Sequence, residues 1–356
     1  MDVSVLICTY NRAALLARTL DSLALSEVSP ALRWEVIVVD NNSTDETPAV
    51  VRARVAGFPC PLRLVFELSQ GKSHALNTGI TASAARVIVF TDDDVWAPPA
   101  WLAAGVEPLI ARRDIEYTGG PVFPMWEVEP PAWIDGDPGL LWGPIALVDY
   151  GREPFIFEDR RRIAMGVNMA VCRSLIERVG GFHPALERRG ATLMGQGQAE
   201  FFFRTRAAGA RGLYVPGMWL KHHVPASRLT RSYYRRWWYW KGVARGSMQD
   251  LHPLTELGID LATVPKIAGI PRFMWGSTVR DAGRWLHALA ARRTARRVEC
   301  EMSLAYFVGY ARQRLARSPA SAAAAGRIPP AHAVSAPAVG AAGVGRNGRV
   351  NPRRRD

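Results

Sequence analysis

The chain has 356 residues, enough for one large domain or two ordinary ones. Its 48% hydrophobic and 22% charged residues are typical of a globular protein rather than a disordered one. A formal net charge of +13 predicts an anionic partner, and nucleic acid, anionic lipid and a phosphorylated small molecule all qualify.

The four cysteines are far apart and form no CxxC pair, which argues against a disulfide scaffold or a zinc site. The N-terminal "MDVSVLICTYNR" lacks the basic and long apolar regions of a signal peptide. No uninterrupted apolar stretch reaches about 18 residues, so we expect no transmembrane helix. These features predict a cytoplasmic protein.

The first hundred residues alternate between strands and helices. Four short apolar runs predict buried strands at Val3–Thr9, Trp34–Asp40, Leu62–Leu68 and Arg86–Asp92. Leucines from Leu15 to Leu23 and the segment around His74–Thr81 predict helices between them. We expect Asn11 to cap the first helix, and Ser43 with Glu46 to form a capping box for the second. This order predicts a mostly parallel sheet flanked by helices, with ligands bound at the carboxyl ends of the strands.

The rest of the chain is less regular. Residues 117–142 are rich in Gly, Pro and Trp and predict a long irregular insertion. A strand and a helix follow, then a short helix in "GQGQAEFFFRTRAAG" and a last strand in "RGLYVPGMWLKHHVP". We expect a domain at 1–228, with a nucleotide-binding half at 1–116 and an acceptor half at 117–228. A helical extension at 229–317 and a disordered Ala/Pro/Gly/Arg-rich tail at 318–356 complete the predicted organisation.

Three consecutive carboxylates, Asp92, Asp93 and Asp94, follow the fourth strand. In an extended turn Asp92 and Asp94 point the same way and Asp93 points elsewhere. Mg²⁺ or Mn²⁺ prefers such carboxylate oxygens and takes its other ligands from phosphates and water. The alternative is an acidic loop that precedes a helix near Pro98.

Neighbouring strand ends supply groups that suit a nucleotide. Asp40 could hydrogen-bond to a base edge, Lys72 could pair with a phosphate, and a metal could bridge a diphosphate. Taken singly, Asp40 is equally a helix-start carboxylate and Lys72 a solvated loop charge. The P-loop motif is absent, and so is a G-x-G-x-x-G after the first strand. Together these residues predict a site for a nucleoside diphosphate.

Several blocks resemble those of family 2 glycosyltransferases with the GT-A fold, a Rossmann-like α/β architecture. They are "VSVLICTYNRAALLARTLDSL", "WEVIVVDNNSTDET", "QGKSHALNTGI" and "VIVFTDDDV", followed by "GVNMAVCRSLIERVGGFHPAL" and "YVPGMWLKHHVP". The resemblance implies transfer of a sugar from a nucleotide-sugar donor, expected to be a UDP-sugar. It also implies inversion, dependence on Mg²⁺ or Mn²⁺, and a glycan or lipid-linked acceptor for surface polysaccharide.

The resemblance also assigns residues by position. Binding of the donor falls to Thr9, Tyr10, Asn11, Arg12, Asp40, Asn42, Lys72, Asn77, Asp92 and Asp93. The metal would lie on Asp92 and Asp94, with His222 where the family often brings a histidine to the metal or diphosphate. A satisfied strand-end histidine is the other interpretation of His222.

The catalytic base is where the sequence departs from the family. The acidic pair expected at the start of the "GQGQAEFFFRTRAAG" helix is replaced by Gly197 and Gln198, and an amide cannot accept a proton. Glu200 lies two residues on and can serve only if the turn is irregular. It is otherwise a first-turn carboxylate meeting the helix dipole. We keep Glu200 and Gln198 as catalytic candidates.

Two rival functions remain. One is a non-catalytic nucleotide-sugar-binding protein that has lost its base, and the weaker one is nucleotidyl transfer. The segment "RSYYRRWWYWKG" (231–242) interleaves aromatic and basic residues. It could pack on the catalytic domain, contact the anionic inner face of the cell membrane, or bind single-stranded nucleic acid. Because no nucleic-acid motif accompanies it, we expect no nucleic-acid partner.

Overall fold

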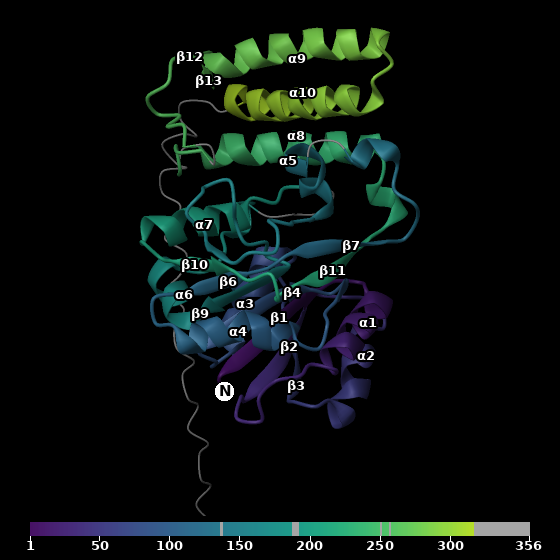
Figure 1. Cartoon of the computed structure of the whole chain (residues 1–356), viewed down its shortest axis with the longest axis vertical. Coiled ribbons are helices and arrows are strands. Elements are labelled where there is room, and N and C mark those ends of the chain that lie inside the picture. Colours follow the sequence, from purple (N-terminus) through teal and green to yellow (C-terminus); the bar gives the residue numbers. More distant parts are fainter. Residues whose placement is uncertain (136–137, 187–191, 250, 256–257, 317–356) are drawn as a thin grey trace, which may run out of the picture.

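The computed structural model describes residues 1–316 except 136–137, 187–191, 250 and 256–257 (Figure 1). The first part of the chain contains β1 (Val3–Thr9), α1 (Ala13–Leu23), β2 (Trp34–Asp40), α2 (Thr47–Arg54), η1 (Val55–Gly57), β3 (Leu62–Phe66), α3 (Lys72–Ala82), β4 (Val87–Asp92), β5 (Val95–Trp96) and α4 (Trp101–Ala111). Next come β6 (Tyr117–Gly119), β7 (Val122–Trp126), η2 (Ala132–Asp135), α5 (Pro138–Leu141), η3 (Gly143–Ile145), β8 (Phe155–Ile156), β9 (Asn168–Cys172), α6 (Arg173–Val179), η4 (Pro184–Leu186) and α7 (Gly197–Ala207). The last described elements are β10 (Gly212–Tyr214), β11 (Leu220–Val224), η5 (Ala226–Arg228), α8 (Arg231–Met248), β12 (Lys266–Ile267), β13 (Ile270–Pro271), α9 (Arg272–Ala290) and α10 (Thr294–Leu315).

The main sheet has the strand order β3-β2-β1-β4-β9-β6-β10-β8. The four strands predicted from the first hundred residues are parallel and adjacent, while β9 runs antiparallel between β4 and β6. The predicted α/β fold is confirmed. Since β1, β2 and β4 end level with one another, the residues that follow them lie along one edge of the sheet.

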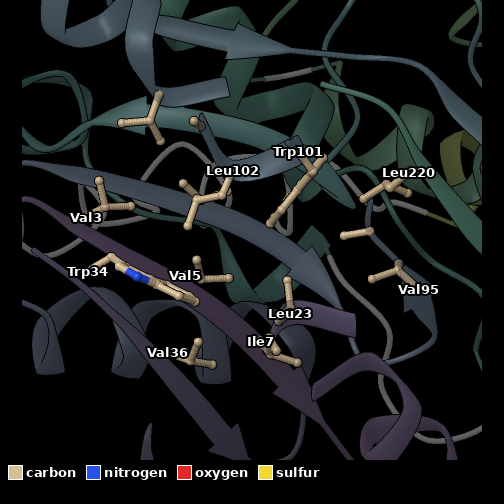
Figure 2. Packing of buried hydrophobic residues seen from close by; sticks show 14 of the residues in the cluster. Val3, Val5, Ile7, Leu23, Trp34, Val36, Val95, Trp101, Leu102 and Leu220 are labelled. Carbon is tan, nitrogen blue, oxygen red and sulfur yellow. The ribbon is translucent and has the colours of Figure 1, made fainter. Parts of the chain in front are cut away.

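The core lies on both faces of this sheet. Figure 2 shows part of one cluster, in which valines of β1 and β2 pack with Trp101 and Leu102 of α4. The β1 and β2 strands are buried on both faces, which explains why their sequences are nearly continuous apolar runs. The indole N–H of Trp101 donates to Asn168 Oδ1 at 2.8 Å, which ties α4 to the start of β9.

Some local predictions were wrong. Residues 117–142 are not wholly irregular, because they contain β6 and β7. The predicted last strand is two strands in different sheets: β10 pairs with β6, and β11 pairs with β5 and β7. Asn11 does not cap α1, and Ser43 with Glu46 does not form a capping box for α2, since neither helix has a side-chain cap. The backbone N–H of Asn11 instead donates to Ser43 Oγ.

The extension beyond residue 228 is helical, as predicted. Figure 1 shows α8, α10 and α9 stacked over the sheet, with α9 outermost. Buried residues of α8 and α10 form one cluster with Trp133, Ile134, Leu141 and Ile145, so the extension packs on the segment between β7 and β8. None of the described helices has the length and apolar character needed to cross a bilayer. The predicted disordered tail, 318–356, lies outside the described residues.

Candidate functional site

The loops after β1 and β2 are locked to each other at the sheet edge. Asn11 adopts a left-handed conformation (φ 52°), and its Oδ1 accepts from the backbone N–H of Thr44 at 2.7 Å. Asp40 is fully buried; its Oδ1 accepts from the N–H of Ser43, but its Oδ2 has no hydrogen-bond partner among the described residues. An unsatisfied buried carboxylate oxygen is costly.

The loop before α3 is organised by Asn41, which sequence reasoning missed. Its Nδ2 donates to the carbonyl of Ser69 at 2.8 Å, and its Oδ1 accepts from the N–H of Gly71 at 2.8 Å. Gly71 has φ 140°, which a side chain would oppose. This turn places Lys72 at the start of α3, where its Nζ lies 2.6 Å from Asp92 Oδ1.

The three aspartates after β4 all meet cations. One guanidinium nitrogen of Arg12 lies 2.9 Å from Asp93 Oδ1 and 2.7 Å from Asp94 Oδ2. Asp93 and Asp94 are buried, whereas Asp92 is partly exposed. Because buried like charges repel, this turn depends on its basic neighbours. Asp93 therefore does not turn away from the site, as the sequence suggested, but shares Arg12 with Asp94.

His222 reaches the aspartates through strand pairing. Asp94 is followed at once by β5, and β11 pairs with β5 in the register His222↔Val95. His222 Nε2 consequently lies 3.3 Å from Asp94 Oδ1. Ligand atoms of Asp92, Asp94 and His222 lie within 4.8 Å of one another. Asp94 Oδ1 has no hydrogen bond among the described residues, so an oxygen remains for a cation. This donor set of two carboxylates and an imidazole fits Mn²⁺ and, less closely, Mg²⁺.

The cationic surroundings affect the two buried carboxyls differently. Burial raises the pKa of Asp93 to about 6, against the opposing charge of Arg12. Burial also acts to raise the pKa of Asp94, but His222 and Arg12 outweigh it and hold that pKa below its ordinary value. Asp94 is thus an ionised carboxylate at neutral pH, the form that binds metal.

These groups lie in a cleft of about 650 Å³. On the donor side it is lined by the strand-end residues Thr9, Tyr10, Arg12, Asn41, Gln70, Gly71, Lys72, Asp92, Asp93 and Asp94. Later segments of the chain also line it, with Gly143, Pro144, Ala146, Met165, Gly166, Gly195, Gln198, His222, Arg228 and Trp237. Arg228 and Trp237 were not predicted as site residues, because only the tertiary structure brings η5 and α8 to the aspartates.

Five predicted site residues do not line the cleft: Asn11, Asp40, Asn42, Asn77 and Glu200. Asn11 and Asp40 shape the loops behind it. Asn42 is exposed with φ 69°, and the neighbouring Asn41 makes the contacts instead. The Asn77 amide is held by the backbone of Phe182, donating to its carbonyl and accepting from its N–H at 2.8 Å each.

Glu200 and Gln198 have separate environments. Glu200 is buried, and the guanidinium of Arg204 contacts both of its oxygens, at 2.8 and 2.7 Å. His252 Nε2 lies 3.0 Å from Glu200 Oε1, and its ring stacks on Phe203. Burial opposes ionisation, but His252 and Arg204 together lower the pKa of Glu200. Gln198 lines the cleft and donates through Nε2 to the carbonyl of Ala164.

The fold has a close counterpart among solved structures. A mannosyltransferase from Pyrobaculum calidifontis, solved in complex with GDP-Man and Mn²⁺, aligns with a TM-score of 0.53 at 22% identity, covering 88% of this chain and 87% of that one. This likeness confirms the GT-A fold expected from the sequence.

Residues 4–177, just under half of the chain, match the model of Glycosyl transferase family 2. Similar curated proteins include the glycosyltransferase AglE of Haloferax volcanii, 33% identical over 120 residues (34% of this chain, 39% of AglE). The succinoglycan biosynthesis protein ExoM of Rhizobium meliloti is 24% identical over 263 residues (70% of this chain, 75% of ExoM). The chain spans 30% and 39% of the length of the first two curated relatives that it matches. The alternative of a non-catalytic binding protein finds no support in these likenesses.

Proposed function

We propose that the protein transfers a sugar with inversion from a UDP-sugar to a glycan or lipid-linked acceptor, using a divalent metal. The observation that carries the proposal is the grouping of Asp92, Asp94 and His222 in a cleft that also contains Lys72 and Arg12. A metal held there supplies Lewis-acid stabilisation for the leaving diphosphate. The neighbouring cations of Lys72 and Arg228 would stabilise the negative charge of the same diphosphate.

The donor side suits a nucleotide. Thr9, Tyr10 and Arg12 line the cleft beside Asn41, and Tyr10 is 46% exposed, so its ring is free to stack on a base. Asp40 lies behind the cleft lining, and we propose that it supports base binding by holding the Ser43 loop through its Oδ1. Asp93 is proposed to bind the donor sugar once Arg12 turns toward the diphosphate.

The two catalytic candidates take different roles in this proposal. Gln198 lines the cleft, so its amide can hold an acceptor hydroxyl, although it cannot take the proton. Glu200 lies outside the lining, with both oxygens engaged by Arg204 and one also by His252. We infer that Glu200 is a positioning residue that orients α7 and that neither residue is the base.

The metal assignment is tested by titrating UDP, in Mn²⁺ and in EDTA, against the wild type and Asp94→Asn. We expect Mn²⁺ to tighten UDP binding, and Asp94→Asn to weaken the Mn²⁺-dependent binding by at least about 100-fold, since even indirect metal contacts are worth 10–100-fold. Asp21→Asn removes the same charge from an exposed side chain paired with Arg54 and serves as the control. Binding of equal strength in EDTA, or in Asp94→Asn, would contradict the metal site.

The donor and outcome of the reaction need separate measurements. GDP is titrated beside UDP because the solved mannosyltransferase holds GDP-Man, and tighter binding of GDP would overturn the uridine assignment. A panel of free glycans and lipid-linked sugars identifies the acceptor. Proton NMR of the product then reports the anomeric configuration, and retention of the donor configuration would overturn the proposed inversion.

A further inference from the structure

Helix α9 uses only one of its faces within the described structure. Its inner face packs on α10: Met274 and Ala288 are buried, and the Trp275 ring lies edge-on to Phe307 with centroids 5.0 Å apart. The indole N–H of Trp285 donates to Glu301 Oε1 at 3.2 Å. Figure 1 places α9 as the outermost element on the side opposite β1–β3. The inner face therefore accounts for the docking of α9 on α10, and these contacts do not use the outer face.

The outer face of α9 carries an apolar stripe. Its members recur every three or four residues and are all exposed: Gly276, Val279, Ala282, Gly283, Leu286, Leu289 and Ala290. Val279 is 73% exposed and Leu286 is 61% exposed. Within residues 1–316, apart from the stated gaps, no element packs on this stripe. Exposed apolar side chains grouped on one helix face are typical of an interaction surface.

A basic edge runs beside the apolar stripe. Arg280, Arg284 and His287 lie along one border of the stripe, and all three are exposed. The exposed Arg292, Arg293 and Arg296 continue the edge beyond the end of α9. From Arg231 to Ala316 the sequence holds 15 Lys and Arg residues against six Asp and Glu residues. Some of this charge complements the helix dipole, but the excess is much larger than one helix end requires.

We propose that the outer face of α9 docks on an anionic lipid bilayer, with the apolar stripe in the headgroup region and the basic edge on the lipid phosphates. An apolar stripe flanked by arginines is the chemistry that such a surface recognises. A second copy of this chain is a poorer occupant, because apposed α9 helices would bring two basic edges together. The proposal does not depend on the proposed enzymatic activity.

The surface is tested by vesicle flotation of the full chain with phosphatidylcholine alone and with 30% phosphatidylglycerol added. We expect binding to the anionic vesicles, weakened by 0.5 M salt. The double variant Val279→Glu/Leu286→Glu is expected to bind at least about 10-fold more weakly, because both carboxylates would enter the headgroup region. Both positions are exposed, so the fold should tolerate the change, and circular dichroism checks this.

The control Val55→Glu/Leu68→Glu adds the same charge at two exposed apolar residues of the catalytic domain. It should bind like the wild type. Equal binding by the α9 variant, or equal loss in the control, would overturn the proposal. So would a wild type that does not float, or a dimer that light scattering detects and that the α9 variant dissociates. UDP titration of the α9 variant distinguishes the two proposals, since donor binding should be unchanged.

Discussion

At the scale of single residues, the site is an arrangement of buried charges that compensate one another. Asp94 is 3% exposed yet remains ionised, because His222 and Arg12 approach it from elements distant in sequence. Glu200 repeats the pattern with Arg204 and His252, away from the cleft. Burial and a shifted pKa are therefore shared by a candidate metal ligand and by a residue that does not line the cleft. Position relative to the cleft distinguishes their roles.

Glu200→Gln should destabilise the protein in a pH-dependent way. The pKa of Glu200 is lowered in the folded state, so its ionised form contributes stability above the unfolded pKa, and that contribution is lost as pH falls through the folded pKa. Removing one partner of a buried ion pair costs about 3 kcal/mol. We expect the free energy of unfolding at pH 7 to fall by about that amount, and the difference from wild type to shrink as the pH falls below the ordinary carboxyl pKa of 4.5.

The same variant separates positioning from catalysis. If Glu200 only positions α7, Glu200→Gln should lower kcat by less than about 10-fold. Loss of a general base lowers the rate by about 10²–10⁴-fold. Arg204→Gln should destabilise to a similar extent, and the two changes together should be less than additive. A kcat loss above about 100-fold in a stable Glu200→Gln protein would show that Glu200 acts in the chemistry.

At the scale of elements, the extension is held by close approach of α8 and α10. A Cβ on Gly242 would lie 2.0 Å from the carbonyl oxygen of Tyr306, and one on Gly309 would lie 1.9 Å from that of Tyr239. Tyr234 and Trp238 are buried against the segment between β7 and β8, where their side chains donate to the carbonyls of Leu141 and Leu140. Of the three interpretations of the aromatic and basic segment 231–242, packing on the catalytic domain accounts for these two residues. Trp237 lines the cleft, and the Lys241 Nζ lies 5.0 Å from the Trp237 ring centroid.

Gly242→Ala should separate these helices and destabilise the extension. Because the atoms that clash are backbone atoms, the strain cannot be relieved by a side-chain rotation, and we expect a loss of about 3 kcal/mol. Gly276→Ala on α9 is the matched control, since a Cβ there meets nothing within 4 Å. It should stabilise by up to about 1 kcal/mol through helix propensity. Thermal unfolding measures both, and equal effects would contradict the proposed close packing.

At the scale of the whole molecule, the sequence predicted what depends on local pattern. The strands β1 to β4 and the acidic turn after β4 are readable because buried parallel strands are continuous apolar runs and their ends share an edge. Contacts between distant segments were not readable from local pattern. The family resemblance placed His222 at the metal, but not the β5–β11 pairing that brings it to Asp94. The contact of His252 with Glu200 and the place of Trp237 in the cleft lining were not predicted. Each depends on packing rather than on periodicity.

Trp237 ties the extension to the function proposed for the catalytic domain. Trp237 lines the same cleft as the aspartates, and a Cβ on Gly143 would lie 3.2 Å from its ring edge. An indole presents a broad apolar surface to the C–H face of a sugar. We therefore expect Trp237→Ala to raise the acceptor KM by about 10-fold, equivalent to ~1.4 kcal/mol, and to leave UDP binding unchanged. Trp237→Phe should restore part of the loss. Trp240→Ala, a half-buried tryptophan of the same helix outside the cleft lining, should leave the acceptor KM at the wild-type value. A change in UDP affinity, or an equal effect of Trp240→Ala, would mean that α8 acts through stability rather than by contacting the acceptor.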